Sequence, residues 1–146
     1  MTGHRPRFHL ALVVDDLEAA RGFYGELLGC REGRSASTWV DFDLYGHQLV
    51  AHLGPPRRDR DAASNRVDGD DVPVPHFGVL LDVAEWEALA ARLREGGVDF
   101  VVEPHVRFEG RPGEQRTMFF RDPAGNAIEV KAFTDDAMVF APDPGL

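Results

Sequence analysis

Three residues with side chains of the kind that bind divalent metal ions each stand in a short apolar run. They are His9, His76 and Glu129. Two neutral imidazoles and one carboxylate suit Fe(II), Mn(II), Ni(II), Co(II) or Zn(II), and in an octahedral ion they leave about three positions open. A substrate with two neighbouring oxygens would chelate such an ion, which would act on it as a Lewis acid. With iron, the open positions would also accept dioxygen.

Each of these residues also has a structural interpretation. A single histidine on an apolar strand is more often a hydrogen-bonded structural residue than a metal ligand. For Glu129 the strongest alternative partner is Arg107. Lys131 is a poor partner, because side chains two residues apart on a strand are separated by about 7 Å. A buried carboxylate without a partner is costly, so a cation beside Glu129 is physically apt.

An internal repeat relates the two histidines. The same number of residues separates His9 from Asp15 and His76 from Asp82. Each half then runs as histidine, apolar strand, aspartate, amphipathic helix, glycine and further strands. Two copies of one unit, each with an apolar face to bury, are expected to pack about a pseudo-twofold axis.

The repeat extends to the last strand of each half. Gly46 precedes Val50 by as many residues as Gly125 precedes Glu129. Positions 9, 50, 76 and 129 are therefore predicted to be equivalent in pairs and to converge. Three of the four carry metal-ligating groups, and the fourth is Val50.

The hydrophobic pattern predicts the elements that would position these residues. The expected strands cover residues 8–14, 39–44, 48–53, 75–81, 98–102, 105–108, 117–120 and 127–133, and the expected helices cover residues 17–28 and 85–95. We expect a single domain, 1–146, with a first βαβββ module at 7–54 and a second at 75–133. Residues 55–74 lack periodicity and are expected to be a linker or lid, and residues 134–146 a C-terminal tail.

The composition excludes several classes of function. The net charge is −9 and the 16 Lys and Arg are scattered, which disfavours nucleic acid as a partner. No run approaches the roughly 20 apolar residues that span a bilayer, so no membrane partner is expected. No secretory signal is apparent and Cys30 is the only cysteine, which fits a cytoplasmic protein. A small-molecule substrate is the expected partner.

The chain resembles the vicinal oxygen chelate superfamily, which includes glyoxalase I, extradiol dioxygenases, fosfomycin-resistance proteins and bleomycin-binding proteins. The matching segments are residues 9–15 (HLALVVD), 23–29 (FYGELLG) and 120–129 (FRDPAGNAIE). The chain is also similar to a compact, functionally uncharacterised group within this superfamily, through residues 46–53 (GHQLVAHL), residues 71–76 (DVPVPH) and residues 103–105 (EPH).

The resemblance implies a fold, a ligand set and an oligomeric state. The fold is α+β, with paired βαβββ modules that form a curved mixed sheet cup. The implied metal ligands are His9, His76 and Glu129, and the implied assembly is a homodimer. Glyoxalase I enzymes commonly add a carboxylate where this chain has Val50. The set that remains looks more like that of extradiol dioxygenases and fosfomycin-modifying enzymes.

Five further residues are candidates for the site, each with a structural alternative. His52 and His105 could act as general bases, because imidazole titrates near neutral pH. Gln48 and Arg107 could orient a substrate oxygen, although polar residues on strands also serve solubility. Phe119 could line the substrate site, with core packing as its alternative.

Three functions from different classes remain open. The first is a divalent-metal-dependent enzyme of dioxygenase-like or lyase/isomerase-like chemistry, holding one Fe, Ni, Zn, Mn or Co ion and acting on a small oxygenated substrate. The second is a non-catalytic resistance protein that binds an antibiotic or similar small molecule, for which a net charge of −9 favours cationic ligands. A third, an inactive interaction domain, would show neither metal nor ligand.

Overall fold

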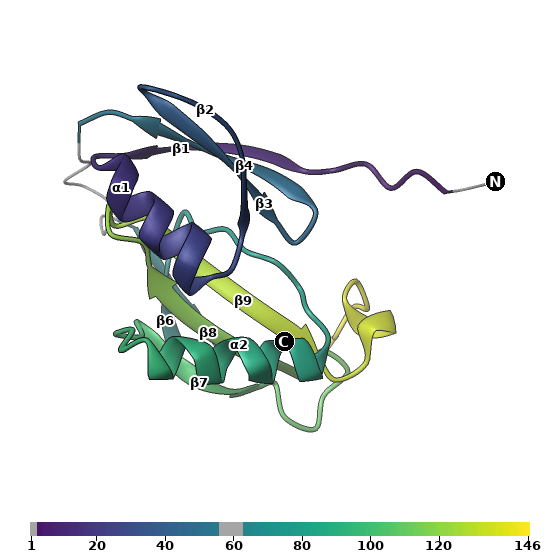
Figure 1. Cartoon of the computed structure of the whole chain (residues 1–146). Coiled ribbons are helices and arrows are strands. Elements are labelled where there is room, and N and C mark those ends of the chain that lie inside the picture. Colours follow the sequence, from purple (N-terminus) through teal and green to yellow (C-terminus); the bar gives the residue numbers. More distant parts are fainter. Residues whose placement is uncertain (1–2, 56–62) are drawn as a thin grey trace. The chain divides into compact units, whose positions relative to one another are not determined.

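The computed structural model describes residues 3–55 and 63–146 (Figure 1). The chain divides into two compact units, Met1–Arg57 and Arg58–Leu146. Among the described residues, the helices are too short or too polar to cross a membrane.

The first unit is a βαβββ module. Its elements are β1 (His9–Val14), α1 (Leu17–Ala20) continued by the π-helix η1 (Arg21–Leu27), β2 (Arg31–Ala36), β3 (Trp39–Leu44) and β4 (His47–Leu53). The strands lie in the order β1-β4-β3-β2, with β1 parallel to β4 and the other neighbours antiparallel. The predicted helix over residues 17–28 is confirmed, although its second part is wound as a π-helix.

Local chemistry explains where these elements begin and end. The carboxylate of Asp16 accepts a hydrogen bond of 3.1 Å from the amide of Ala19 and caps the helix. The turn between β3 and β4 has Tyr45 at φ 50° and Gly46 at φ 88°. Positive φ at both central residues is the geometry of tight hairpin turns, and it sets the register of β4.

The second unit repeats this arrangement. Its principal elements are α2 (Val83–Glu95), β7 (Val102–Arg107), β8 (Gln115–Arg121) and β9 (Ala127–Phe133), with the strands in the order β7-β8-β9. The predicted strand at residues 75–81 forms only two isolated parallel bridges to β9, at Phe77 and Leu80. It still exchanges backbone hydrogen bonds with β9, including one of 2.8 Å from the amide of Glu129 to the carbonyl of Phe77.

The registers of the two units agree with the repeat seen in the sequence. In the first unit Ala11 lies opposite Val50. In the second, Phe77 lies opposite Ile128. The next residues along, Gly78 and Glu129, thus occupy the positions that correspond to Ala11 and Val50. The equivalence of Val50 and Glu129 within their modules is therefore a property of the fold.

Each unit has its own apolar core. In the first, the rings of Tyr24 and Phe42 pack 5.4 Å apart and both side chains are buried. In the second, α2 lies along the sheet of β7, β8 and β9 (Figure 1). Its buried face includes Trp86, whose indole N–H donates a hydrogen bond of 2.9 Å to the carbonyl of Val130. The same strand that carries Glu129 is thus fixed from the helix side.

Four strands differ from expectation. The predicted βαβββ module requires a strand before residue 39, but no range was predicted for β2, because its sequence REGRSA is polar and all six residues are exposed. Two strands were predicted, at residues 98–102 and 105–108, and the structure has one, β7 (Val102–Arg107), whereas residues 98–101 are not in a strand. Within the segment expected to be a linker or lid, β5 (Ser64–Val67) and β6 (Asp70–Pro73) form an antiparallel hairpin through a turn at Asp68-Gly69. Residues 56–62 of that segment lie outside the described residues.

The backbones of Gly78 and Glu129 approach very closely. A Cβ atom added at Gly78 would overlap the carbonyl oxygen of Glu129. Because that oxygen belongs to the backbone of β9, it has no side-chain freedom with which to move away. We therefore predict that Gly78→Ala destabilises the protein by at least about 3 kcal/mol, measured by urea denaturation.

The matched control for this prediction is Gly22→Ala. Gly22 is helical and an added Cβ would meet nothing within 4 Å. This control is expected to gain about 0.5–1 kcal/mol, because alanine loses less conformational entropy than glycine in a helix. An unchanged denaturation midpoint for Gly78→Ala would contradict the close approach.

Candidate functional site

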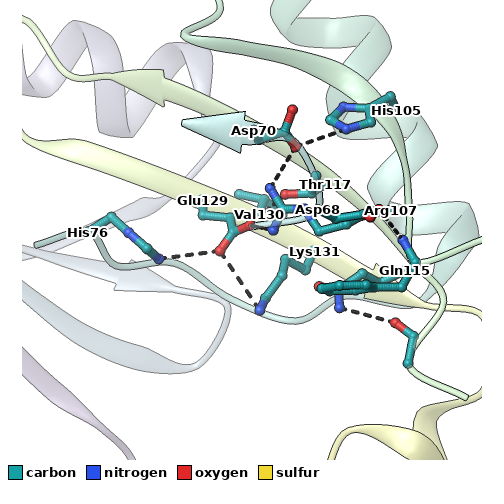
Figure 2. A network of polar contacts seen from close by, with 12 residues as sticks. Asp68, Asp70, His76, His105, Arg107, Gln115, Thr117, Glu129, Val130 and Lys131 are labelled. Atoms are coloured by element: carbon teal, nitrogen blue, oxygen red, sulfur yellow. Dashed lines mark hydrogen bonds and ion pairs between the residues drawn. The ribbon is translucent and has the colours of Figure 1, made fainter. Parts of the chain in front are cut away.

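The carboxylate of Glu129 is the centre of a buried polar network on β8 and β9 (Figure 2). Glu129 is only 6% exposed. Its Oε2 accepts a hydrogen bond of 2.6 Å from the hydroxyl of Thr117 and one of 3.2 Å from Nη1 of Arg107. These two bonds fix the orientation of the carboxylate. The interaction with Arg107 is the structural alternative foreseen for Glu129, and the structure contains it.

The second oxygen of the carboxylate faces different groups. Oε1 lies 3.3 Å from Nε2 of His76 and 3.8 Å from Nζ of Lys131. The expectation that Lys131 is too far from Glu129 was wrong. It considered the spacing of the backbone positions, whereas the long lysine side chain bends back along the strand. Two of the three predicted ligands, His76 and Glu129, are therefore brought together.

The ring of His76 is held from its other nitrogen. Nδ1 lies 2.6 Å from the carbonyl oxygen of Pro73, which can only accept a hydrogen bond. Nδ1 therefore carries a proton, and in the neutral ring Nε2 is left with a lone pair. The edge-to-face contact with Phe119, at 4.9 Å between ring centroids, restrains the ring further. The lone pair of Nε2 is thus directed toward Oε1 of Glu129.

The two partners shift each other's protonation in opposite directions. The hydrogen bond to Glu129 raises the pKa of His76 above its ordinary value of 6.5, and the bond to Pro73 adds to this against the effect of burial. Burial raises the pKa of the Glu129 carboxyl. The hydrogen bonds from His76 and Thr117 and the charges of Lys131 and Arg107 lower this pKa by more than burial raises it. The pKa of Glu129 therefore lies below its ordinary value of 4.5.

The network continues from Arg107 to the β5–β6 hairpin. Arg107 is 3% exposed, and its Nη2 lies 3.0 Å from Oδ2 of Asp70. Nε2 of His105 lies 3.0 Å from the same oxygen (Figure 2). The structure therefore places His105 on the hairpin side of Arg107, bonded to Asp70. Arg107 itself bridges Asp70 and Glu129.

Phe119, a predicted substrate-binding residue, is fully buried. It contacts His76 through its ring, and the guanidinium of Arg107 lies 5.9 Å from its ring centroid. Its observed contacts are therefore with the polar network around Glu129. The ring packs against this network and shields it from water.

The first unit holds His9 by a similar device. Nδ1 of His9 lies 2.8 Å from Oε1 of Gln48. Nε2 of Gln48 donates a hydrogen bond of 3.3 Å to Oδ2 of Asp41, so the amide oxygen faces His9. An oxygen acceptor at Nδ1 places the proton there and leaves Nε2 of His9 with a lone pair. Gln48, predicted to orient substrate, is thus observed to orient a histidine.

Asp41 was missed by the sequence analysis. It is 7% exposed and stands between Val40 and Phe42, both buried, in the middle of β3. A charged residue at a buried strand position is unusual, and that pattern was the available signal.

His52 lies on β4, two residues beyond the buried Val50, and its side chain is exposed. Within residues 3–55 and 63–146, no group of three His, Cys, Asp or Glu side chains is close enough to hold a metal ion. His9 belongs to the first unit, whereas His76 and Glu129 belong to the second.

Comparison with known proteins identifies the family. The sequence model of the Glyoxalase/Bleomycin resistance protein/Dioxygenase superfamily matches residues 8–130. The chain belongs to this superfamily. The α+β fold class expected from the sequence, with few helices and curved sheets, is confirmed by this match and by solved structures.

Several solved structures are similar to this chain. A glyoxalase/bleomycin resistance protein/dioxygenase from Alicyclobacillus acidocaldarius is 32% identical, with a TM-score of 0.76 over 96% of this chain and 100% of that one. A glyoxalase/dioxygenase from Nostoc punctiforme is 22% identical, with a TM-score of 0.66 over 90% and 92%. The fosfomycin resistance protein FosX from Listeria monocytogenes is 21% identical, with a TM-score of 0.62 over 92% and 96%. A search of curated proteins gave no match.

The opposite pKa shifts predict how stability depends on pH. Because the pKa of His76 is raised in the folded state, its contribution to the free energy of unfolding is fully present below about pH 6.5. That contribution is lost as the pH rises through the pKa of His76 in the folded protein. A lowered pKa makes the Glu129 contribution complete above about pH 4.5, and it is lost as the pH falls through the folded value. In chelator, the pair therefore stabilises the protein most between about pH 4.5 and 6.5.

The measurement is the urea midpoint of wild type and His76→Gln across pH 4 to 9 in chelator. The wild type is expected to exceed the variant by most inside that window, and its advantage is expected to shrink above it. A constant difference between the two proteins at every pH would show that the pair of charges contributes nothing.

Proposed function

We propose that this protein is a divalent-metal-dependent enzyme of the vicinal oxygen chelate type that acts on a small oxygenated substrate. The proposed metal ligands are Nε2 of His76, Oε1 of Glu129 and Nε2 of His9. One observation carries the proposal: Nε2 of His76 and Oε1 of Glu129 face each other 3.3 Å apart, while the other polar atoms of both side chains are already bonded.

Two lone pairs that face each other require a cation between them or beside them. In the absence of a metal, a proton on Nε2 of His76 fills this role. A divalent ion is the other group that would satisfy both atoms, and it would replace that proton. Metal-bound histidines usually donate the second ring N–H to a backbone carbonyl or a carboxylate. The bond from Nδ1 of His76 to Pro73 matches this pattern.

The carboxylate also fits a ligand that binds through one oxygen. Thr117 and Arg107 hold Oε2, which leaves Oε1 as the atom available to an ion. Hydrogen bonds to the non-ligating oxygen orient such ligands and are part of most metal sites. The set of two imidazoles and one carboxylate suits Fe, Ni, Zn, Mn or Co.

His9 is proposed as the third ligand because of the repeat and because of its own hydrogen bonds. Gln48 accepts from its Nδ1, so in the neutral ring its Nε2 carries a lone pair, as does that of His76. When bound, the divalent ion would supply Lewis acidity toward a substrate with two neighbouring oxygens.

His52 is the better of the two proposed general bases. It is exposed on β4, whereas His105 is engaged by Asp70 and would first have to leave that carboxylate. Lys131, 3.8 Å from Glu129, is a further residue that could hold a substrate oxygen. We also propose a homodimer, in keeping with the family.

A second function is favoured by a specific observation. Arg107 and Lys131 already surround the carboxylate of Glu129 with positive charge. This arrangement would let the network remain stable without a metal, as in a non-catalytic protein that binds an antibiotic or similar compound. Titration with metal separates the two functions.

The experiment is calorimetric titration of chelator-treated protein with Zn(II), Ni(II) and Mn(II). We expect about one ion per chain for at least one metal. Glu129→Gln and His76→Gln are each expected to weaken its binding by at least about 100-fold, because each removes a ligand rather than an outer contact, whose loss costs about 10- to 100-fold.

The matched control is His105→Gln, which removes a histidine from the same network without removing a proposed ligand. Its metal affinity is expected to stay within a few-fold of the wild type. Circular dichroism of each variant excludes loss of fold as the cause. Equal affinity in wild type, Glu129→Gln and His76→Gln would refute the proposed ligands and favour the non-catalytic function.

A further inference from the structure

The first unit contains a pocket that the proposed metal site does not account for. Its volume is about 390 Å³, and residues from the N-terminal segment and from β2, β3 and β4 line it. The residues that matter for its chemistry are Arg7, Arg31, Arg34, Asp41, His47 and Gln48. A space of this size admits a small organic molecule.

The pocket gathers positive charge in a protein that is strongly negative. Three arginines line it, against two aspartates, Asp41 and Asp43, whereas the whole chain has a net charge of −9. Within the described part of the chain, Arg7 has no carboxylate within 4 Å. The local balance of charge is therefore the reverse of that of the chain.

The two paired arginines are only loosely engaged. Nη2 of Arg31 lies 3.7 Å from Asp43, and Nε of Arg34 lies 3.5 Å from Asp41. Both distances exceed the roughly 2.7–3.2 Å of a good N–H···O hydrogen bond. The two side chains are also 86% and 80% exposed. Most of their N–H donors are therefore available to a ligand.

His47 adds a neutral donor to the same pocket. Its Nδ1 accepts a hydrogen bond of 2.9 Å from the backbone amide of Phe8. Since Nδ1 accepts, the proton of the ring is on Nε2. His47 is therefore a hydrogen-bond donor among the residues that line the pocket. Phe42 contributes apolar surface to the same wall.

We propose that this pocket binds an oxyanion, a carboxylate or a phosphate, carried on a small apolar body. Guanidinium groups suit such anions because their planar donors pair with two oxygens at once. Gln48 connects the pocket to the proposed function, since it lines the pocket and also accepts the hydrogen bond from His9. This proposal rests on the proposed metal-dependent function. It implies that the substrate is an anion, whereas the net charge of the chain favours a cationic ligand.

The test is calorimetric titration of the chelator-treated full chain with four probes of similar shape. Benzoate and phenyl phosphate carry the two oxyanions, benzamide is the neutral analogue and benzamidine the cationic one. At least one anion is expected to bind at least about tenfold more tightly than benzamide, and to bind more weakly as salt is added. The tighter anion identifies the class.

The variant Arg31→Gln/Arg34→Gln is expected to weaken binding of the anion by at least tenfold. Arg94→Gln, on α2 of the other unit, removes a charge elsewhere and is expected to change nothing. Binding of benzamidine as tightly as of the anions, equal binding of benzamide, or unchanged anion affinity in the double variant would each overturn the proposal.

Failure of this proposal is distinguishable from failure of the metal site. His76→Gln is expected to lose metal affinity and keep anion affinity, and Arg31→Gln/Arg34→Gln to do the reverse. Anion binding in a wild type that takes up no metal would support the pocket and refute the metal site. Metal binding with no preference for anions would do the opposite.

Discussion

The buried charge of Glu129 is the constraint on which the second unit depends. A carboxylate in the middle of a strand, almost without access to water, must be compensated by hydrogen bonds and positive charge. The protein divides that task between the two oxygens. Thr117 and Arg107 hold Oε2 firmly, whereas Oε1 faces His76 and, at longer distance, Lys131. One oxygen is therefore structural, and the other is available for chemistry. The hairpin of β5 and β6 extends the network, because Asp70 holds the far side of Arg107.

In both units a histidine donates a hydrogen bond from Nδ1 to an oxygen atom, but the acceptors differ. In the second unit, the backbone carbonyl of Pro73 accepts a hydrogen bond from Nδ1. In the first, the side chain of Gln48 does so, and Asp41 holds that amide in turn. In both neutral rings the proton lies on Nδ1 and the lone pair on Nε2. The last strand of each module then distinguishes the two halves, since the register places Val50 in one and Glu129 in the other. The repeat thus supplies two similarly held imidazoles and a single carboxylate.

The sequence predicted those parts of the molecule in which apolar periodicity and turn chemistry agree. The strands at 39–44 and 127–133 match the observed bounds, and an aspartate precedes each helix as expected, although the cap of the first helix is Asp16 and not Asp15. Strand β2 and the β5–β6 hairpin escaped prediction because their residues are mostly exposed and lack an apolar period. The role of Asp41 depends on a side chain seven residues away on the next strand, and no local pattern records such a contact. The contact of Lys131 with Glu129 depends on a flexible side chain, which spacing along a strand does not describe.

X-ray diffraction from crystals of the metal-loaded protein, recorded at the absorption edge of the bound metal, tests the central claim most directly. The account predicts one anomalous peak per chain, bonded to Oε1 of Glu129 and to Nε2 of His76 and of His9, with Oε2 still bonded to Thr117 and Arg107. An ion bound elsewhere, or the carboxylate of Glu129 still paired with His76 in fully loaded protein, would contradict it.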